Sequence, residues 1–300
     1  MSVLVVGSTA LDSIKTPCRL NPRLLGGSAS HAAVAASFFA PVKLVGIVGD
    51  DFPRRYIQLY RRHGIDLGGL QLASGKTFHW AGEYEVNMNN RRTLTTELGV
   101  FETFTPNLPE AYRQTPFVLL ANIAPALQHQ VLNQMRRPRF VVADTMDLWL
   151  NIALDDLLKL LRRVDALVLN DSEARQLTQE DNIIAAAKKI HRLGPKYAIV
   201  KKGEHGALLS SPGGMFISPA FPLNKVVDPT GAGDSFVGGM VGYLAGRSRG
   251  APDAHLKRGM IYGSVVASFC CEGFGLTRTT RLTREAIEQR ARLLERMVRF

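Results

Sequence analysis

Short apolar runs rich in Val, Ile and Leu alternate along the chain with longer segments in which apolar residues recur at helical spacing. The short runs predict strands over Val3–Val6, Leu44–Val48, Phe117–Ala121, Phe140–Ala143, Ala166–Leu169 and Tyr197–Val200. The longer segments predict helices over Ser28–Phe39, Phe52–His63, Ala126–Met135, Ile152–Leu161, Ile183–Leu193, Ser235–Leu244, Ala254–Phe269 and Thr283–Val298. Continuously apolar strands separated by helices are typical of an α/β fold with a mostly parallel sheet covered on both faces.

Glycines and polar residues follow the predicted strands: Gly7, Gly49-Asp50, Asn122, Asp144, Asn170 and Lys202-Gly203. In a doubly wound sheet these strand ends lie along one edge, and ligands bind in the crevice outside it. We therefore expect a substrate groove at this edge, although turns after strands are also often polar for no further reason.

A different pattern occupies residues 74–105, where residues alternate in polarity and Asn89-Asn90 predicts a turn. This pattern predicts antiparallel strands inserted between two βα units. They could form a lid that excludes water from the groove; an ordinary edge hairpin or a dimer contact is the alternative. No linker or internal repeat divides the chain, so we predict one domain over 1–300, with lid strands at about 12–25 and 74–105. A second hairpin is predicted over 206–218.

The 300 residues and 46% apolar content suit one large α/β domain. Met1 leads directly into the first predicted strand without the basic segment or cleavage site of a secretory signal, and no apolar run reaches membrane-spanning length. These features predict a cytoplasmic protein with no membrane partner. Cys18, Cys270 and Cys271 are odd in number and two are adjacent, which predicts reduced thiols rather than disulfides or a metal cluster.

The net charge of +11 comes from basic residues dispersed in short pairs such as Arg54-Arg55 and Arg91-Arg92. Dispersed pairs are typical of a solvated surface that favours anionic substrates such as a nucleotide. A nucleic-acid-binding surface is the alternative, and the absence of a dense basic cluster or tail in the sequence argues against it.

Residues 228–236, Asp-Pro-Thr-Gly-Ala-Gly-Asp-Ser-Phe, form the most informative segment. Gly231, Ala232 and Gly233 are small residues at a predicted helix start, where N–H groups without intrahelical partners and the helix dipole bind anions such as phosphate. Asp234 places a carboxylate beside that site. An anion cradle next to a carboxylate base is what phosphoryl transfer to a hydroxyl needs. The alternative is that Asp234 only caps its helix, which would not require Gly-Ala-Gly ahead of it.

This segment resembles the C-terminal signature of the ribokinase-like (PfkB) family of carbohydrate and nucleoside kinases, and the resemblance runs from Val3 to about Gly275. It implies a three-layer α/β/α domain with a mostly parallel central sheet and a small β-strand lid. It also implies that Asp234 is the general base, and that the backbone of Gly231, Ala232 and Gly233 is the anion hole for the transferred γ-phosphoryl group.

The same resemblance assigns residues to the acceptor. Gly26-Gly27 looks like the family's N-terminal Gly-Gly motif, which lets the chain pass close to the acceptor. Family members commonly have Asn where His31 stands, so His31 is either a substrate contact or a helix residue packed under the groove. Asp12 falls where the family places a carboxylate that grips acceptor hydroxyls, unless it only forms a turn. Asn122 is expected as a further acceptor contact.

Other residues match the family's nucleotide and metal motifs. Asn170 and Glu173 look like the Asn-x-x-Glu motif, in which Glu173 holds magnesium through water and Asn170 orients the triphosphate; an Asx turn with Glu173 at a helix start is the alternative. The family often has a monovalent cation bracing the anion-hole loop, with an acidic residue at the position of Asp228, so the resemblance allows potassium there.

The loop beginning at Lys201 resembles the family's path along the nucleotide phosphates, with Gly203 and Gly206 lining it. Family members often have Thr where Lys201 stands, so the sequence assigns this side chain no definite role. Gly263 lies in a stretch of small residues that would line the adenine pocket, or pack in the core.

These residues predict an ATP- and magnesium-dependent kinase that phosphorylates a hydroxyl of a sugar or polyol. A nucleoside is the alternative acceptor and is only slightly less favoured. Phe78, Trp80 and Tyr84 of the lid could stack on a base, pack on a sugar face or form the core of a homodimer. The competing classes are a non-catalytic kinase-like protein that binds nucleic acid or another protein, and a nucleotide sensor that binds ATP without transferring it.

Overall fold

The computed structural model describes residues 1–17, 19–88, 91–247 and 252–299 and contains two sheets. The large sheet has nine strands in the order β13-β12-β11-β10-β9-β8-β1-β4-β5. Their bounds are β1 Val3–Val6, β4 Val42–Gly49, β5 Ile65–Ala73, β8 Phe117–Leu120, β9 Phe140–Asp144, β10 Ala166–Asn170, β11 Tyr197–Lys201, β12 Ala207–Ser211 and β13 Gly214–Ser218. In this spatial order, the strands β11, β10, β9, β8, β1, β4 and β5 are all parallel to one another. Strands β12 and β13 add an antiparallel hairpin at one edge. This confirms the predicted α/β fold with a mostly parallel sheet.

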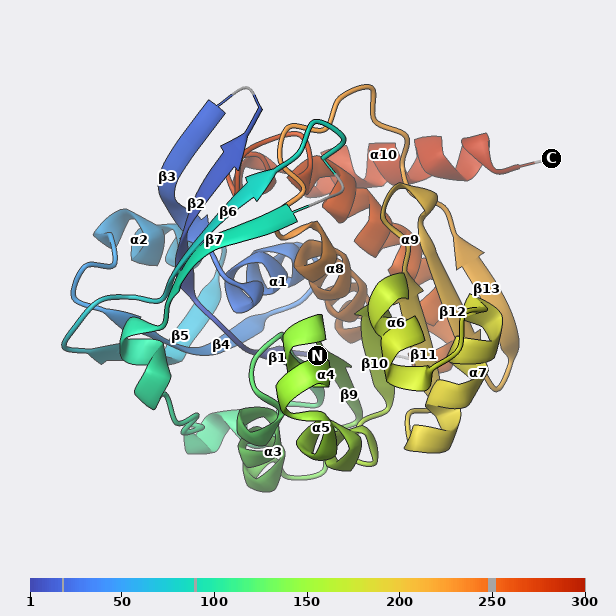
Figure 1. Ribbon diagram of the computed structural model, residues 1–300, viewed down its shortest axis with the longest axis horizontal. Helices are drawn as coiled ribbons and strands as arrows, with labels where there is room; N and C mark the ends of the chain where they lie inside the picture. The colour runs from blue at the N-terminus through green and yellow to red at the C-terminus, as the bar shows by residue number, and fades with distance from the viewer. Residues whose placement is uncertain (18, 89–90, 248–251, 300) are drawn as a thin grey trace.

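Helices cover both faces of this sheet (Figure 1). Their bounds are α1 Ser28–Ser37, α2 Arg54–Arg62, α3 Pro125–Gln134, α4 Asp147–Ile152, α5 Leu154–Leu161, α6 Asp171–Thr178, α7 Ile183–Leu193, α8 Ala232–Gly246, α9 Pro252–Cys270 and α10 Arg284–Met297. Along β1, Val3 and Val5 join the core under α1, α2, α8 and α9, whereas Leu4 and Val6 join the core under α3, α5, α6 and α7. Because side chains alternate along a strand, a run of four apolar residues supplies both layers.

Helices α1 and α8 pack unusually close together. A Cβ atom on Gly238 would overlap the carbonyl oxygen of Ala32, and one on Gly242 would lie 2.7 Å from the Cα atom of Ala36. Both helices are therefore buried along nearly their whole length. This contact matters for the site, because α1 follows Gly26-Gly27 and α8 begins within the Gly-Ala-Gly segment.

The lid is a second sheet of four strands in the order β3-β2-β6-β7. It stands above the left part of the large sheet in Figure 1 and consists of β2 Ala10–Thr16, β3 Arg19–Gly26, β6 His79–Tyr84 and β7 Arg91–Glu97. The predicted antiparallel pair within 74–105 is confirmed as β6 with β7, and β2 adds a parallel strand beside β6, a pairing that the pattern did not predict. Strands β2 and β6 follow the parallel strands β1 and β5, which end at the same edge, so they leave it in the same direction.

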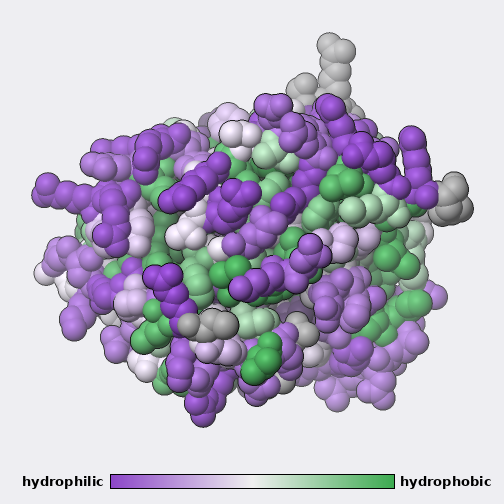
Figure 2. Space-filling view, turned by 90° about the horizontal axis from the view of Figure 1, so that it is seen from above, coloured by the Kyte–Doolittle hydropathy of each residue, from purple (hydrophilic) through white to green (hydrophobic). Residues whose placement is uncertain are grey.

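The lid's outer strands β3 and β7 expose apolar side chains, among them Leu20 and Leu94. From above, hydrophilic side chains dominate the surface and apolar ones appear in smaller patches between them (Figure 2). The homodimer through the lid stays a prediction. Asn89-Asn90 and Cys18 lie outside the described residues, and Cys270 and Cys271 are free thiols. In the described part of the chain, no helix is long and apolar enough to cross a membrane.

Candidate active site

Helix α8 begins at Ala232, three residues before the predicted start at Ser235. Its N-cap is Gly231, whose φ of +76° lies in the left-handed region that other residues rarely adopt. Asp234 is therefore in the first turn, as the sequence predicted. The N–H of Ala232 donates to the carbonyl of Pro229 at 3.1 Å, so this member of the predicted anion hole is engaged within the loop itself.

The two glycines of this loop let neighbouring side chains approach closely. A Cβ atom on Gly231 would overlap the ring of His31, and one on Gly233 would lie 3.3 Å from the Nζ atom of Lys201. The loop is thus packed between a helix residue on one side and a cation at the strand edge on the other. Because Gly231 and Gly233 carry no side chains, their backbone N–H groups are open to an anion.

His31 is buried in α1, with 1% of its surface exposed. Its Nδ1 atom lies 3.8 Å from the Sγ atom of Cys270, and Nε2 has no hydrogen-bond partner among the described residues. Burial lowers the pKa of His31 to about 4, so the ring is neutral at physiological pH. The geometry matches the alternative that His31 packs under the groove, where it supports Gly231.

Asp228 anchors the same loop from below. Its carboxylate accepts the N–H of Thr230 at 2.9 Å and the N–H of Gly275 at 2.8 Å, and the side chain is fully buried. Burial raises its pKa and these N–H donors oppose the rise. Both oxygens thus already have backbone donors, and a monovalent cation at Asp228 stays a prediction.

Asp12 lies on the acceptor side, on β2, and is 5% exposed. A Cβ atom on Gly26 would overlap its carboxylate, and the N–H of Gly27 donates to Oδ2 at 3.4 Å. Gly26-Gly27 therefore makes room for Asp12 itself. Burial raises the pKa of Asp12 to about 7, the Gly27 N–H opposes the rise, and the charges of Asp228 and Asp234 add to it. The charge of Asp234 thus reaches Asp12 across the space between β2 and the start of α8.

Asn122 follows β8, but its amide is engaged by residues that the sequence did not single out. Its Oδ1 atom accepts the indole N–H of Trp149 at 2.8 Å, and its Nδ2 atom lies 2.9 Å from the sulfur of Met146. Its carbonyl accepts the hydroxyl of Ser28 at 3.0 Å. Asn122 thus ties α4 and its N-cap residue to the start of α1, and its contact with an acceptor stays a prediction.

Asn170 and Glu173 form a capping box at the start of α6. The Oδ1 atom of Asn170 accepts the N–H of Glu173 at 2.8 Å, and Oε2 of Glu173 accepts the N–H of Asn170 at 2.7 Å. The local turn considered as the alternative is therefore present. Burial raises the pKa of Glu173 to about 7, opposed most strongly by the charge of Lys201.

Glu173 could bind magnesium only together with ligands from outside the protein. Among the described residues, no group of three or more His, Cys, Asp or Glu side chains is arranged to hold a metal ion. A single carboxylate such as Glu173, with water and phosphate oxygens, is the usual way in which proteins hold magnesium beside a nucleotide.

Lys201 ends β11 and forms an ion pair with Asp144 at the end of β9, with 2.9 Å between Nζ and Oδ1. The two side chains are 18% and 5% exposed. From the sequence, Asp144 is expected only as a polar residue after a strand, and Lys201 has no definite role. The pair was missed because a strand pattern does not show that β9 and β11 lie on either side of β10.

The remaining glycines serve turns and packing. Gly203 and Gly206 have φ of +56° and +81° in the turn between β11 and β12. Gly263 is buried in α9, where a Cβ atom would lie 3.1 Å from the Cδ2 atom of Phe236 on α8. This is the core packing considered as the alternative for Gly263. The lining of an adenine pocket by this residue stays a prediction.

The lid meets the loop at Tyr84. The hydroxyl of Thr230 donates to the Tyr84 hydroxyl at 3.1 Å, and Tyr84 is 6% exposed. Because side chains alternate along a strand, Trp80 and Tyr84 share one face of β6, the face toward the loop. Arg91 of β7 lies over the Trp80 ring, 5.2 Å from its centroid. The charge of Arg91 also lowers the pKa of Asp12 and Asp234.

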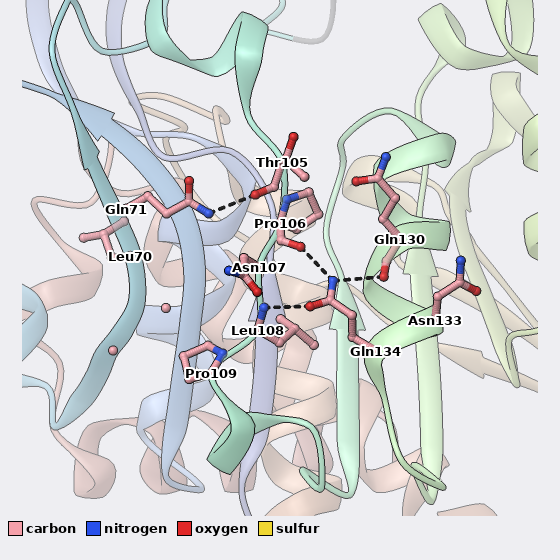
Figure 3. Close-up of a pocket in the computed structure, with 12 residues that line it drawn as sticks. Leu70, Gln71, Thr105, Pro106, Asn107, Leu108, Pro109, Gln130, Asn133 and Gln134 are labelled. Carbon is pink, nitrogen blue, oxygen red and sulfur yellow. Dashed lines mark hydrogen bonds between the residues drawn. The ribbon is translucent and has the colours of Figure 1, made fainter.

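A cavity of about 860 Å³ lies elsewhere, between β5, the segment 105–109 and α3 (Figure 3). Its lining amides are tied into the protein: Gln71 donates to the carbonyl of Thr105, and Gln134 donates to that of Pro106. None of the predicted site residues lines it. We therefore place the candidate active site at the carboxyl edge of the sheet, under the lid.

The fold is that of the ribokinase-like phosphotransferases. The nucleoside kinase of Methanocaldococcus jannaschii, described as an archaeal member of the ribokinase family, superposes with a TM-score of 0.78 at 20% identity, over 97% of this chain and 98% of that chain.

The sequence comparisons place the chain more closely. Residues 10–281 match the model of the pfkB family carbohydrate kinases. The cytidine kinase of Thermococcus kodakarensis is 31% identical over 84% of this chain and 90% of that protein. The nucleoside kinase of Thermoplasma acidophilum is 26% identical over 83% and 78%. The chain belongs to the PfkB family and is an ATP-dependent phosphotransferase with an alcohol acceptor.

Proposed function

We propose that the protein is a nucleoside kinase that transfers the γ-phosphoryl group of ATP to a ribose hydroxyl. The observation that carries this proposal is the pairing of Asp12 on β2 with Trp80 on β6 in the lid sheet. Register partners on adjacent strands place their side chains on the same face, so a carboxylate for hydroxyls lies beside an indole for a base. The similarity to a cytidine kinase and a nucleoside kinase supports the same choice over a sugar or polyol, which the sequence alone ranked first.

In the proposed reaction, Asp12 accepts hydrogen bonds from the ribose hydroxyls and holds the acceptor next to Asp234. Asp234 takes the proton of the reacting hydroxyl as its oxygen bonds to the γ-phosphorus. The bond from that phosphorus to the β,γ-bridging oxygen breaks, and ADP leaves with the bridging oxygen.

Charge on the transferring group is stabilised by the backbone N–H groups of Gly231 and Gly233 at the start of α8, since that of Ala232 already donates to Pro229. Glu173 would hold magnesium through water, and the ion would supply neutralisation of the triphosphate charge. Asn170 would orient the triphosphate beside Glu173, and Gly203 and Gly206 would line its path.

The lid closes the site in this proposal. Tyr84 contacts Thr230 of the loop, so the lid and the anion-binding segment are in direct contact. Water is the competing acceptor for the phosphoryl group, and covering the loop reduces its access. Trp80 and Arg91 would lie over the base of the bound nucleoside.

The experiment is release of ADP from magnesium-ATP with matched acceptors: cytidine, uridine, adenosine, inosine, ribose, fructose and an inositol. We expect one or more nucleosides to give kcat/KM at least about tenfold above every free sugar or polyol, corresponding to about 1.4 kcal/mol from contacts to the base. Turnover with a sugar or polyol and not with any nucleoside would contradict the acceptor class while leaving the kinase reaction intact. Binding of ATP without turnover of any acceptor would favour a nucleotide sensor.

A further inference from the structure

Lys201 and Asp144 form a largely buried ion pair at the catalytic edge rather than in the core. Their strands, β11 and β9, flank β10, which ends in Asn170 of the proposed nucleotide site. The Nζ atom of Lys201 lies 2.9 Å from Oδ1 of Asp144. The pair therefore spans the end of β10, on the side where β10 leads into Glu173.

The ammonium group also lies against the anion-binding loop. A Cβ atom on Gly233 would lie 3.3 Å from Nζ, so the cation borders the first turn of α8. The carboxylates of Asp144, Glu173 and Asp234 all raise the pKa of Lys201, which keeps the group charged although it is buried. A lysine ammonium has three N–H donors, so it can hold Asp144 and a phosphate oxygen at the same time.

We propose that Lys201 is a catalytic residue that contacts the γ-phosphoryl group of ATP, and that Asp144 positions it. This inference rests on the proposed kinase function and names a charged contact additional to the backbone donors of α8. A lysine serves such a role as a point charge at the phosphate. Asp144 would hold that charge beside Gly233 before the nucleotide arrives, so that no side-chain reorganisation accompanies transfer.

The Lys201 ammonium group also influences the pKa of Asp234, the proposed general base. The charged groups around Asp234 come from several elements: Lys201 on β11 and Arg91 on β7 lower its pKa, and its own charge raises the pKa of Asp144 on β9 and Asp12 on β2. Burial raises the pKa of Asp234, and Lys201 opposes this most strongly. Loss of Lys201 should therefore move the acid limb of the kcat profile to higher pH.

The test compares the affinities of ATP and ADP, measured by titration calorimetry without acceptor, in wild type and Lys201→Met. Contact with the γ-phosphoryl group predicts that Lys201→Met weakens ATP binding at least about tenfold more than ADP binding, as expected for loss of a charge-assisted bond. Lys188→Met is the matched control: Lys188 lies exposed on α7, and its affinities should equal those of the wild type. Equal losses of ATP and ADP affinity, or none, would overturn the assignment.

Removing only the lysine leaves Asp144 buried without its partner, which can destabilise a fold by several kcal/mol. The double variant Lys201→Met/Asp144→Asn removes both charges, so neither side chain is left buried as an unpaired ion. We expect it to fold and still to lack the wild-type preference for ATP over ADP. If it recovered that preference and wild-type kcat, Lys201 would be only the structural partner of Asp144, and the proposal would be wrong.

The positioning role of Asp144 has its own readout. Asp144→Asn should lower kcat while Lys201 is present and have no further effect in the Lys201→Met background, because the two residues act as a unit. Independent, additive losses would contradict positioning. Absence of wild-type turnover with every acceptor would defeat the proposed function, whereas the comparison of ATP with ADP would still test Lys201.

Discussion

Asp12 and Trp80 are direct register partners in the parallel pair β2–β6 of the lid sheet. The strand that supplies the acceptor carboxylate therefore also fixes the indole beside it. Leu11 pairs in the same way with His79, and the hydroxyl of Ser13 lies 3.0 Å from Nε2 of His79, so neighbouring pairs help to hold this register. A shift by one residue would send either side chain to the opposite face.

Trp80 should therefore discriminate nucleosides from free sugars. We predict that Trp80→Ala raises the KM for a nucleoside about 10- to 100-fold, since stacking of a base on an aromatic ring contributes about 1–3 kcal/mol. The KM for ribose, measured as a slow acceptor, should change little. Trp80→Phe keeps an aromatic face and is the matched control. A similar loss for ribose and nucleoside would mean that the indole supports the lid and not the base.

Asp12 should make acceptor binding depend on pH near neutrality. Its pKa is raised to about 7, so the group is mostly protonated about one pH unit below that value and mostly ionised one unit above. A protonated carboxyl accepts fewer hydrogen bonds, so the KM for the acceptor should rise as the pH falls through this window. Asp12→Asn should raise that KM and flatten its pH dependence. An unchanged slope in Asp12→Asn would assign the titration to another group.

Gly231 should not tolerate a side chain. Gly231→Ala forces a non-glycine residue into the left-handed region, at about 1–2 kcal/mol, and drives its Cβ atom into the His31 ring. We predict a lower Tm and a large loss of kcat. The double variant Gly231→Ala/His31→Ala relieves the overlap but keeps the backbone strain, so it should recover part of the Tm. No recovery would show that His31 does not limit this loop.

Much of the fold follows from local pattern. All six strands and all eight helices expected from apolar runs and helical spacing are present, with ends within about three residues. The edge strand β5 lacked that signal because its buried and open positions alternate and Gly68-Gly69 interrupt it. Helix α6 is short and largely polar, and its start is specified by the Asn170–Glu173 capping box rather than by apolar spacing.

The site was only partly predictable. The segment 228–236 and the Gly26-Gly27 pair are each a continuous stretch of sequence. Their small residues therefore indicate, without knowledge of the fold, that another group comes close to the backbone there. The Lys201–Asp144 pair joins residues 57 apart in the sequence, and the Asp12–Trp80 pair depends on a parallel lid register. Neither leaves a local pattern. The role of His31 likewise depends on α1 and α8 lying side by side, which becomes clear only from glycines 238 and 242 in the structure.

The central claim is that Asp234 is the general base of phosphoryl transfer to a nucleoside. The most direct test is cytidine-dependent ADP release by Asp234→Asn beside the wild type, together with ATP affinity measured without acceptor. We predict that kcat falls about 10²–10⁴-fold, the usual contribution of a positioned base, while ATP affinity stays within about threefold. An Asp234→Asn variant that keeps near-wild-type kcat at comparable ATP affinity would contradict the account.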